Sequence, residues 1–177
     1  DKHNKILLLQ YGSERTDRYG RLLAHAWLDD GTNVAARLLQ LGLATTLVVP
    51  PNTRAQACYQ QQEDDARRAS LGLWSLPAYR SQASNSLPAS SRGFHIIHGT
   101  VTAIRRSRHN VWITLDGRVT IRISNRDLVN FDADFPADLA GQTLEVRGWL
   151  KTNRDGLRMS VRHPAALAII TPSRGYW

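Results

Sequence analysis

Four residues near the N-terminus have types and spacing that suit phosphate chemistry: Asp17, Tyr19, Gly20 and Arg21. The apolar stretches on either side predict two strands, so this polar stretch is the turn that joins them. Gly20 permits a sharp bend, which aims Arg21 outward from the start of the second strand. An arginine there can bind a phosphate through two parallel N–H bonds and stabilise charge that develops on it. In the alternative interpretation, Asp17 and Arg21 pair across the turn and only hold the hairpin together.

The elements around this turn mix strands with helices. Apolar spacing predicts strands over residues 5–11 and 22–28, a helix over 34–41 and a polar helix over 54–70. Gly42 ends the first helix, and residues 50–53 supply a break and a cap for the second. We therefore expect a hairpin followed by two helices.

The chain from about residue 5 to residue 80 resembles staphylococcal nuclease almost without gaps. The anchors, in order, are Thr16-Asp17-Arg18-Tyr19-Gly20-Arg21-Leu22-Leu23-Ala24, Asp30-Gly31, Leu41-Gly42-Leu43-Ala44, Pro51-Asn52-Thr53, Glu63, Ala66 and Leu71-Gly72-Leu73-Trp74-Ser75. Several separated anchors in the right order make the resemblance specific. It implies that Arg21 is catalytic, stabilising the phosphate during phosphodiester hydrolysis, that Tyr19 lies at the phosphate or nucleotide, and that Arg18 contacts nucleic acid.

The resemblance also has departures. The family binds calcium through carboxylates, and uses a glutamate and a second arginine, on barrel strands that precede the segment matched here; nothing in the first 12 residues replaces them. Val48 and Pro50 stand at about the place of the tyrosines that flank the base in the family, so we expect weaker base stacking. No metal or cofactor is predicted for these residues, and calcium is expected for the full-length parent.

These departures lead to an expectation about the first 80 residues. We expect residues 1–80 to be the C-terminal half of a nuclease-like domain. Such a half has too few strands to close a barrel by itself. We expect the N-terminal nuclease half to be supplied in cis or in trans, and residues 1–177 alone to be inactive. Whether the parent is an active thermonuclease-like phosphodiesterase stays open.

Cys58 is the one cysteine of the chain. It is either a free, buried thiol or the partner of a cysteine outside these residues. The surrounding Ala57-Cys58-Tyr59 looks like exported bacterial members of the family, which implies a disulfide with the upstream half and favours a periplasmic or secreted location.

The second half of the chain changes character. Residues 81–92 have the composition of a linker, and residues 93–177 alternate apolar and polar side chains with turns between them. Five strands with a short helix at 125–131 between the third and fourth predict an OB-fold barrel. The fold class is thus α+β then β: a partial nuclease-type barrel with helices over 1–80, then a five-stranded OB barrel.

The alternation divides the barrel residues into an inner and an outer set. The predicted core is Val111, Ile113, Val119, Ile121, Val146, Met159 and Val161, and the outward set is Trp112, Arg122, Arg147, Trp149, Arg158 and Arg162. Tryptophans among arginines suit single-stranded nucleic acid, with rings for bases and cations for phosphates. Alternatively, the tryptophans cover the barrel end or pack on the nuclease half, and the arginines are solvated.

A basic loop is predicted between the first two strands, at a place where OB folds grip ligands. It holds Arg105, Arg106, Arg108 and His109. A charge run is also commonly just a solvated face. His95 and His98 have no carboxylate or cysteine spaced to complete a metal shell, so no zinc site is predicted.

Net charge favours a polyanionic partner. The chain carries +8, with 10 basic and 8 acidic residues up to residue 80 and 13 basic and 7 acidic residues after it. All but three of the basic side chains are arginines, which suit forked phosphate contacts. No run of 18 apolar residues occurs, so no helix that inserts into a membrane is predicted.

Three functions remain open from the sequence. The first is a calcium-dependent nuclease with an accessory nucleic-acid-binding barrel. The second is a non-catalytic binding or scaffold module of the same fold. The third is a protein-docking domain at the cell envelope. Preference for DNA or RNA, oligomeric state and pathway cannot be read from these residues.

Overall fold

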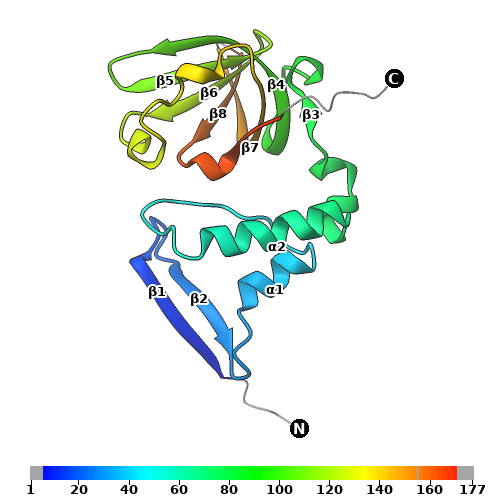
Figure 1. Cartoon of the computed structure of the whole chain (residues 1–177), viewed down its shortest axis with the longest axis vertical. Helices are drawn as coiled ribbons and strands as arrows, with labels where there is room; N and C mark the ends of the chain where they lie inside the picture. The colour runs from blue at the N-terminus through cyan, green and yellow to red at the C-terminus, as the bar shows by residue number, and fades with distance from the viewer. Residues whose placement is uncertain (1–5, 155, 171–177) are drawn as a thin grey trace. The chain divides into compact units, whose positions relative to one another are not determined.

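The computed structural model describes residues 6–154 and 156–170 and divides into two compact units, Asp1–Pro77 and Ala78–Trp177 (Figure 1). The first unit combines a β-hairpin with two α-helices, and the second is a closed barrel. Position 5 of the first predicted strand and Asp155 of a predicted barrel turn lie outside the described residues. None of the described helices is long and apolar enough to cross a membrane.

The hairpin and helices of the first unit follow the predicted order. They are β1 (Leu7–Thr16), β2 (Leu22–Leu28), α1 (Val34–Gln40) and α2 (Gln56–Arg68), followed by 3₁₀ helices at Gly72–Ser75 and Pro77–Tyr79, the last crossing into the second unit. The strands pair antiparallel, and the register shifts between Tyr11 and Thr16. This irregularity lets β1 run five residues past its predicted end at Tyr11, into the turn region.

The two helices are fixed by different means. The side chain of Asn33 caps α1 by accepting a hydrogen bond from the Ala36 backbone N–H at 3.0 Å. The cap predicted for α2 at residues 50–53 is wrong, because the N-cap is Ala55 in a left-handed conformation with no side-chain bond. Asn52, within the predicted cap, bonds to β1 instead, as described below.

A buried carboxylate joins α2 to the segment that precedes it. Glu63 is fully buried and accepts hydrogen bonds from the backbone N–H and the hydroxyl of Thr46, the former at 3.0 Å. The segment over residues 43–48 has no regular secondary structure. A buried carboxylate that accepts several hydrogen bonds is stable only while its partners stay in place, so Glu63 fixes this segment on α2.

The hairpin leaves much apolar side-chain area in contact with solvent. Along β1 and just before it, Ile6, Leu7, Leu8 and Leu9 are between 46% and 63% exposed, although they point alternately to the two faces. A strand that is apolar on both faces is typical of the interior of a larger sheet. The sheet described here has only β1 and β2, so these faces are uncovered by the described residues.

The second unit is a five-stranded barrel with two short additional strands. Its strands are β3 (Gln82–Ala83), β4 (Gly93–Arg106), β5 (Asn110–Leu115), β6 (Val119–Ser124), β7 (Thr143–Asn153), β8 (Gly156–Val161) and β9 (Leu167–Ile169). The order β4-β5-β6-β8-β7 closes because β4 also pairs with β7. All neighbours in this ring are antiparallel except β6 and β8, which are parallel. The predicted five-stranded barrel is confirmed.

The inner set of barrel residues predicted from alternation is confirmed. Each of them is at most 2% exposed and belongs to one apolar cluster: Val111, Ile113, Val119, Ile121, Val146, Met159 and Val161. Burial of alternate residues on β5 and β6 fixes their register, because a slip of one residue would turn the apolar set outward.

The helix predicted at 125–131 is wrong in type, since the structure has a short 3₁₀ turn at Asp127–Asn130. A second 3₁₀ turn, Ala137–Leu139, and a third, Pro164–Ala166, complete the barrel's connections. Phe131 and Phe135 lie between the first two turns, with ring centroids 4.4 Å apart, and pack against the core. Apolar anchoring of this connection to the core replaces a regular helix.

The segment over residues 81–92 packs on the barrel, although its composition predicts a linker. Leu87 is 3% exposed and belongs to the barrel core, and its carbonyl accepts two hydrogen bonds from the Arg118 guanidinium. Ser84, within the 3₁₀ turn Ser84–Ser86, is fully buried and donates to the Asp116 carboxylate at 2.5 Å. One buried leucine and two polar anchors are enough to order a segment that is otherwise rich in serine.

Candidate phosphate-binding turn and basic barrel surface

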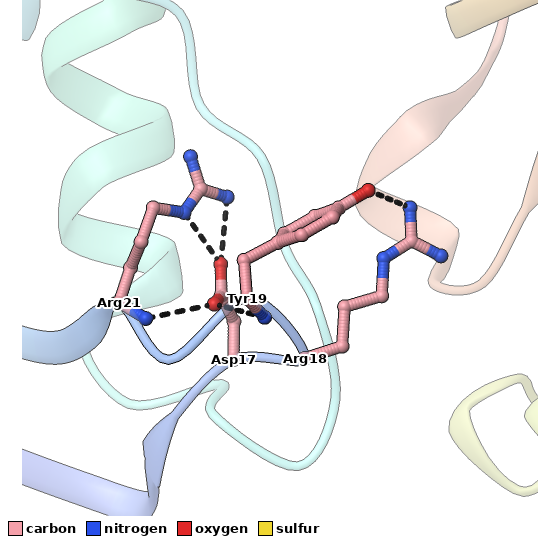
Figure 2. Close-up of polar contacts among 4 residues, drawn as sticks. All are labelled: Asp17, Arg18, Tyr19 and Arg21. Atoms are coloured by element: carbon pink, nitrogen blue, oxygen red, sulfur yellow. Dashed lines mark hydrogen bonds and ion pairs between the residues drawn. The ribbon is translucent and has the colours of Figure 1, made fainter.

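The turn between β1 and β2 is organised by the Asp17 carboxylate (Figure 2). One carboxylate oxygen accepts from the backbone N–H groups of Tyr19 at 2.8 Å and Arg21 at 3.0 Å. The other accepts from the Arg21 side chain, from Nε at 2.7 Å and from Nη2 at 2.6 Å. Gly20 takes a positive φ of 77°, which the bend requires and which glycine adopts without strain. The Asp17–Arg21 pair of the alternative interpretation is therefore present.

The electrostatics of the turn favour an ionised Asp17. Desolvation by itself raises the pKa of this carboxyl, but the hydrogen bonds from the Arg21 side chain and from the backbone N–H groups of Arg21 and Tyr19 outweigh it. The pKa of Asp17 consequently lies below its ordinary value of 3.8. At neutral pH the turn carries a carboxylate that holds Arg21 in one orientation.

Pairing with Asp17 occupies only some of the N–H donors of the Arg21 guanidinium. The side chain is 76% exposed, and the two bonds to Asp17 employ Nε and one N–H of Nη2. A guanidinium has five N–H donors in one plane, so Nη1 and the second N–H of Nη2 remain to meet a phosphate in a forked contact. Holding the hairpin and binding phosphate are thus compatible roles for this arginine.

Tyr19 lies beside two guanidinium groups at the tip of the turn. The residue is 67% exposed, and the guanidinium carbons of Arg18 and Arg21 lie 4.7 Å and 5.4 Å from its ring centroid. Arg18, Tyr19 and Arg21, the predicted catalytic and nucleic-acid-binding residues of this hairpin, therefore lie together at the turn (Figure 2). An exposed ring flanked by cations offers one place for both a base and a phosphate.

A pocket of about 310 Å³ lies on the same hairpin, and the sequence did not predict it. Its walls come from β1, β2 and the segment before α2: Tyr11, Gly12, Ser13, His25, Pro51, Asn52, Thr53 and Arg54. Asn52 bonds to both backbone groups of Glu14, accepting from the N–H at 3.0 Å and donating to the carbonyl at 2.9 Å. A Cβ at Gly12 would lie 2.4 Å from the Asn52 amide oxygen, so the close approach requires glycine.

His25, in the pocket wall, belongs to a polar network with α2. Its Nδ1 lies 2.6 Å from the Tyr59 hydroxyl, which also accepts from the Asn33 amide at 3.0 Å. The network joins β2, the cap of α1 and α2, and so stiffens one side of the pocket. No local signal could have indicated it, because the partners are 26 and 34 residues apart.

Carboxylates that could bind calcium are not clustered among the described residues. These residues contain no group of three or more histidine, cysteine, aspartate or glutamate side chains that could hold a metal ion. Calcium needs six to eight oxygen ligands, and the nearest carboxylate to Arg21, that of Asp17, already accepts four hydrogen bonds in the turn.

Cys58, in the first turn of α2, is exposed. The interpretation of this residue as a buried thiol is therefore wrong. A disulfide to another segment stays a prediction.

The barrel places most of its predicted surface residues outward but divides the predicted basic loop. Arg105 and Arg106 lie in β4, and only Ser107, Arg108 and His109 connect it to β5. The loop assignment for Arg105 and Arg106 is therefore wrong. The Arg106 guanidinium donates to the Phe135 carbonyl at 3.1 Å, whereas Arg105 lies opposite Trp112.

The two tryptophans differ in their surroundings. Trp149 is 62% exposed on β7, whereas Trp112 is half-buried on β5 under the Arg158 guanidinium, whose carbon lies 4.8 Å from the ring centroid. Arg122 lies opposite Trp112 and donates through Nε to Asn110 at 2.8 Å. Tertiary structure thus gathers Trp112, Arg122 and Arg158 on one outer face.

The first unit is similar to known nucleases. Residues 2–76 match the family described as staphylococcal nuclease homologue. The chain is 36% identical over 72 residues to a thermonuclease of Staphylococcus intermedius, covering 40% of this chain and 42% of that protein. It is 32% identical over 96 residues to the SPbeta prophage-derived endonuclease YokF of Bacillus subtilis (strain 168), covering 53% and 29%. It is 39% identical over 67 residues to endonuclease YncB of the same organism, covering 37% and 31%.

These matches identify residues 2–76 as a staphylococcal-nuclease-like domain, which the sequence resemblance predicted. The chain spans between 29% and 42% of the length of these relatives.

Proposed function

We propose that this chain is part of a nuclease that hydrolyses phosphodiester bonds, with Arg21 as the residue that contacts the reacting phosphate. The observation that carries the proposal is the Arg21 guanidinium, which is held by Asp17 yet 76% exposed at the tip of a nuclease-like hairpin. Its remaining N–H donors can stabilise charge that builds up on the phosphate during the reaction. Tyr19 and Arg18 lie beside it and would contact the nucleotide and the neighbouring phosphate.

The proposal includes a further polypeptide segment, in cis or in trans. Calcium supplies Lewis-acid chemistry in nucleases of this family, and the described residues gather no metal site. The uncovered apolar faces of β1 point to the same need, since a partner segment with its own apolar strands would bury them. A disulfide from Cys58 and export from the cytoplasm would suit such an arrangement.

We assign the barrel to the OB type and give it an accessory role in binding single-stranded nucleic acid. The order of strands around the ring supports this type. If β4, β5, β6, β7 and β8 are numbered 1 to 5 along the chain, their order around the barrel is 1-2-3-5-4, and strand 4 pairs with strand 1 to close it. Strands 3 and 5 are the parallel pair. Support for the role is the outward grouping of Trp112, Arg122 and Arg158 and the excess of basic residues in this half.

The test compares two proteins: the whole product of the gene and residues 1–177. With calcium, the whole product should cleave single-stranded DNA, and Arg21→Ala should lower kcat by about 10²- to 10³-fold, the usual loss on removing one charge-stabilising donor. Residues 1–177 should show no calcium-stimulated cleavage. Calcium-stimulated cleavage by residues 1–177 that disappears in Arg21→Ala would refute the need for another segment.

A non-catalytic binding module is the second candidate. The observation that favours it is the Asp17–Arg21 pair together with the lack of a metal-binding cluster among the described residues. A whole gene product that binds DNA but does not cleave it with calcium would establish this alternative. A gene product that binds no nucleic acid would leave the third interpretation, protein docking.

A further inference from the structure

The pocket lined by residues 11–13, His25 and residues 51–54, here called the Asn52 pocket, has a fixed frame. The Asn52 amide bonds to both backbone groups of Glu14, so the segment before α2 is held on β1. Gly12 approaches the Asn52 side chain so closely that no Cβ fits between them. The volume of about 310 Å³ lies at the lower end of the range for small-molecule sites, about 300–1,000 Å³. The cavity is therefore a built feature of the nuclease-like unit.

His25 supplies the pocket wall with an N–H donor, and its partners determine which nitrogen carries the proton. The Tyr59 hydroxyl accepts from the Asn33 amide at 3.0 Å. Its own proton has two possible acceptors, His25 Nδ1 at 2.6 Å and Asn33 Oδ1 at 3.3 Å, and the latter already accepts from the Ala36 N–H. The proton consequently goes to Nδ1. A neutral imidazole then carries its hydrogen on Nε2, which has no hydrogen-bond partner among the described residues.

Three further side chains of the wall can donate hydrogen bonds. The hydroxyls of Ser13 and Thr53 and the guanidinium of Arg54 make no side-chain hydrogen bond or ion pair within residues 6–154 and 156–170. Arg54 is exposed and contributes five N–H donors and a positive charge. Donors from β1, from β2 and from the segment before α2 thus surround one cavity.

The charge around the Asn52 pocket is positive. Its lining residues include no aspartate or glutamate, and the first turn of α2 contains none either. The nearest acidic residue along the chain, Glu14, follows Ser13 and does not line the pocket. The next residue, Arg15, places its guanidinium carbon 5.3 Å from the centroid of the Tyr11 ring. A cation without a carboxylate partner attracts an anion, and a guanidinium flanked by N–H and O–H donors suits a phosphate.

The pocket lies on the same strand as the candidate phosphate-binding turn. Arg21 directly precedes β2, and His25 is four residues further along, about 13 Å at about 3.3 Å per residue. An even separation places both side chains on the same face of an extended strand. A nucleic-acid strand that rises about 3.4 Å per nucleotide covers this distance in about four nucleotides. One strand can therefore meet both places.

We propose that the Asn52 pocket is a second phosphate-binding site for the strand whose reacting phosphate lies at Arg21. Arg54 meets the phosphate in a forked contact, and His25 Nε2–H and the Thr53 hydroxyl donate to its oxygens. The proposal rests on the proposed function for the class of polymer and for the position of the strand at Arg21. A second contact on the same strand raises affinity because its binding is intramolecular once the first contact has formed.

The test follows the His25 imidazole nitrogen signals by NMR in residues 1–177, with EDTA present to prevent cleavage. The ligands are inorganic phosphate, thymidylyl-thymidine, which has one phosphate, and hexathymidylate, which has several. Hexathymidylate should shift these signals at the lowest concentration, since one strand then reaches both His25 and Arg21. Arg21→Ala should weaken the response to hexathymidylate and leave the response to the dinucleotide unchanged, because a single phosphate cannot occupy both places.

Substitutions in the pocket separate a phosphate contact from a general effect of charge. Arg54→Ala should lower the slope of log affinity against log salt for hexathymidylate by about 0.7, the value for one phosphate contact on a single strand. Arg54→Lys should keep most of the slope but weaken binding, because an ammonium cannot make the forked contact. Thr53→Val should weaken binding about 2- to 12-fold, the equivalent of one net hydrogen bond. The matched control is Arg37→Ala, which removes an exposed arginine of α1 outside the pocket and should leave the slope unchanged.

The outcomes distinguish failure of the pocket from failure of the proposed function. If Arg54→Ala and Thr53→Val both bind hexathymidylate as Arg37→Ala does, the pocket proposal is wrong, even where Arg21→Ala weakens binding. Inorganic phosphate that shifts the His25 signals at the same concentration as hexathymidylate would also overturn it, in favour of a site for free phosphate. A pocket response to hexathymidylate that Arg21→Ala leaves unchanged would support the phosphate site and contradict the role proposed for Arg21.

Discussion

At the scale of single residues, Asp17 is the side chain that sequence reasoning undervalued. The pattern drew attention to Arg21, whereas the structure shows that one carboxylate sets the turn through two backbone and two side-chain hydrogen bonds. Arg21 is consequently a held arginine rather than a freely moving one, which reduces the conformational entropy it loses on meeting a phosphate. Asp17 is a positioning residue for the candidate site.

The first prediction concerns the titration of this carboxyl. Its pKa in the folded protein is lowered, so its contribution to stability is complete above the unfolded pKa and is lost as pH falls through the lowered folded pKa. In Arg21→Ala the pKa of Asp17 should rise towards the ordinary value of 3.8, because the side-chain bond and the charge of Arg21 are gone. Carboxyl chemical shifts followed by NMR against pH would measure it. An unchanged Asp17 pKa in Arg21→Ala would contradict the pairing described here.

The second prediction concerns His163, which caps the 3₁₀ turn Pro164–Ala166. Its Nδ1 accepts from the Ala165 backbone N–H at 3.1 Å, and desolvation lowers the pKa of the imidazole below 6.5. Neutral histidine can accept this bond and protonated histidine cannot. The cap should persist above pH 6.5 and be lost as pH falls through the lowered pKa.

The Ala165 amide shift against pH reports this cap directly. His163→Asn should remove the pH dependence, because an asparagine side chain accepts the same bond at any pH. Retention of the transition in His163→Asn would assign it to another group.

At the scale of elements, some segments were predictable from the alternation of apolar and polar residues along them. Others are ordered only by their contacts with distant residues. β5 and β6 agree with the strands predicted from alternation. The segment over residues 81–92 has no such pattern and is ordered by Leu87, Ser84 and the guanidinium of Arg118. It is therefore part of the barrel's stability, not a spacer.

The third prediction follows for Leu87. Leu87→Ala should lower the free energy of unfolding of the barrel by about 2 to 5 kcal/mol, the usual cost of such a cavity in a core. The matched control is Val129→Ala, since Val129 is 85% exposed on the same unit, and its effect should stay within about 0.5 kcal/mol. Denaturant unfolding followed by tryptophan fluorescence would measure both variants. Equal effects of the two substitutions would show that this segment is a linker after all.

At the scale of the whole molecule, the two units differ in how much apolar surface they bury. The barrel core gathers 16 buried hydrophobic residues. In the described part of the first unit, Leu39, Ala66 and Trp74 are the buried hydrophobic residues. Stability scales with buried apolar area, so the first unit should be the weaker one unless another polypeptide segment covers β1.

The fourth prediction is a difference in hydrogen exchange. In residues 1–177, backbone amides of β5 and β6 should exchange only through global unfolding of the barrel, whereas amides of β1 and β2 should exchange much faster through local opening. Exchange measured by mass spectrometry would resolve both regions in one experiment. Addition of the segment that covers β1 should slow exchange in the hairpin and leave the barrel unchanged. Equal protection of the two regions in residues 1–177 would contradict the assignment of an uncovered hairpin.

The sequence by itself determined the local features of this protein. The bounds of β2, the inward set of the barrel and the nuclease-like character of the first unit were all predicted, because they depend on spacing between near neighbours and on the order of anchors along the chain. Strand alternation assigns a side chain to a face before any partner is known, and for that reason Trp149 and Arg122 were placed outward correctly.

Only the tertiary structure decided which of these features meet. The bond from Asn52 to Glu14 spans 38 residues, Leu87 reaches the barrel core from a serine-rich segment, and Arg158 covers a tryptophan 46 positions earlier in the sequence. Such contacts depend on the free energy of the whole packed chain. The entropic cost of closing a loop rises only slowly with its length, so contacts between residues far apart in sequence form almost as readily as those between nearer residues. Spacing along the chain therefore carries no record of them.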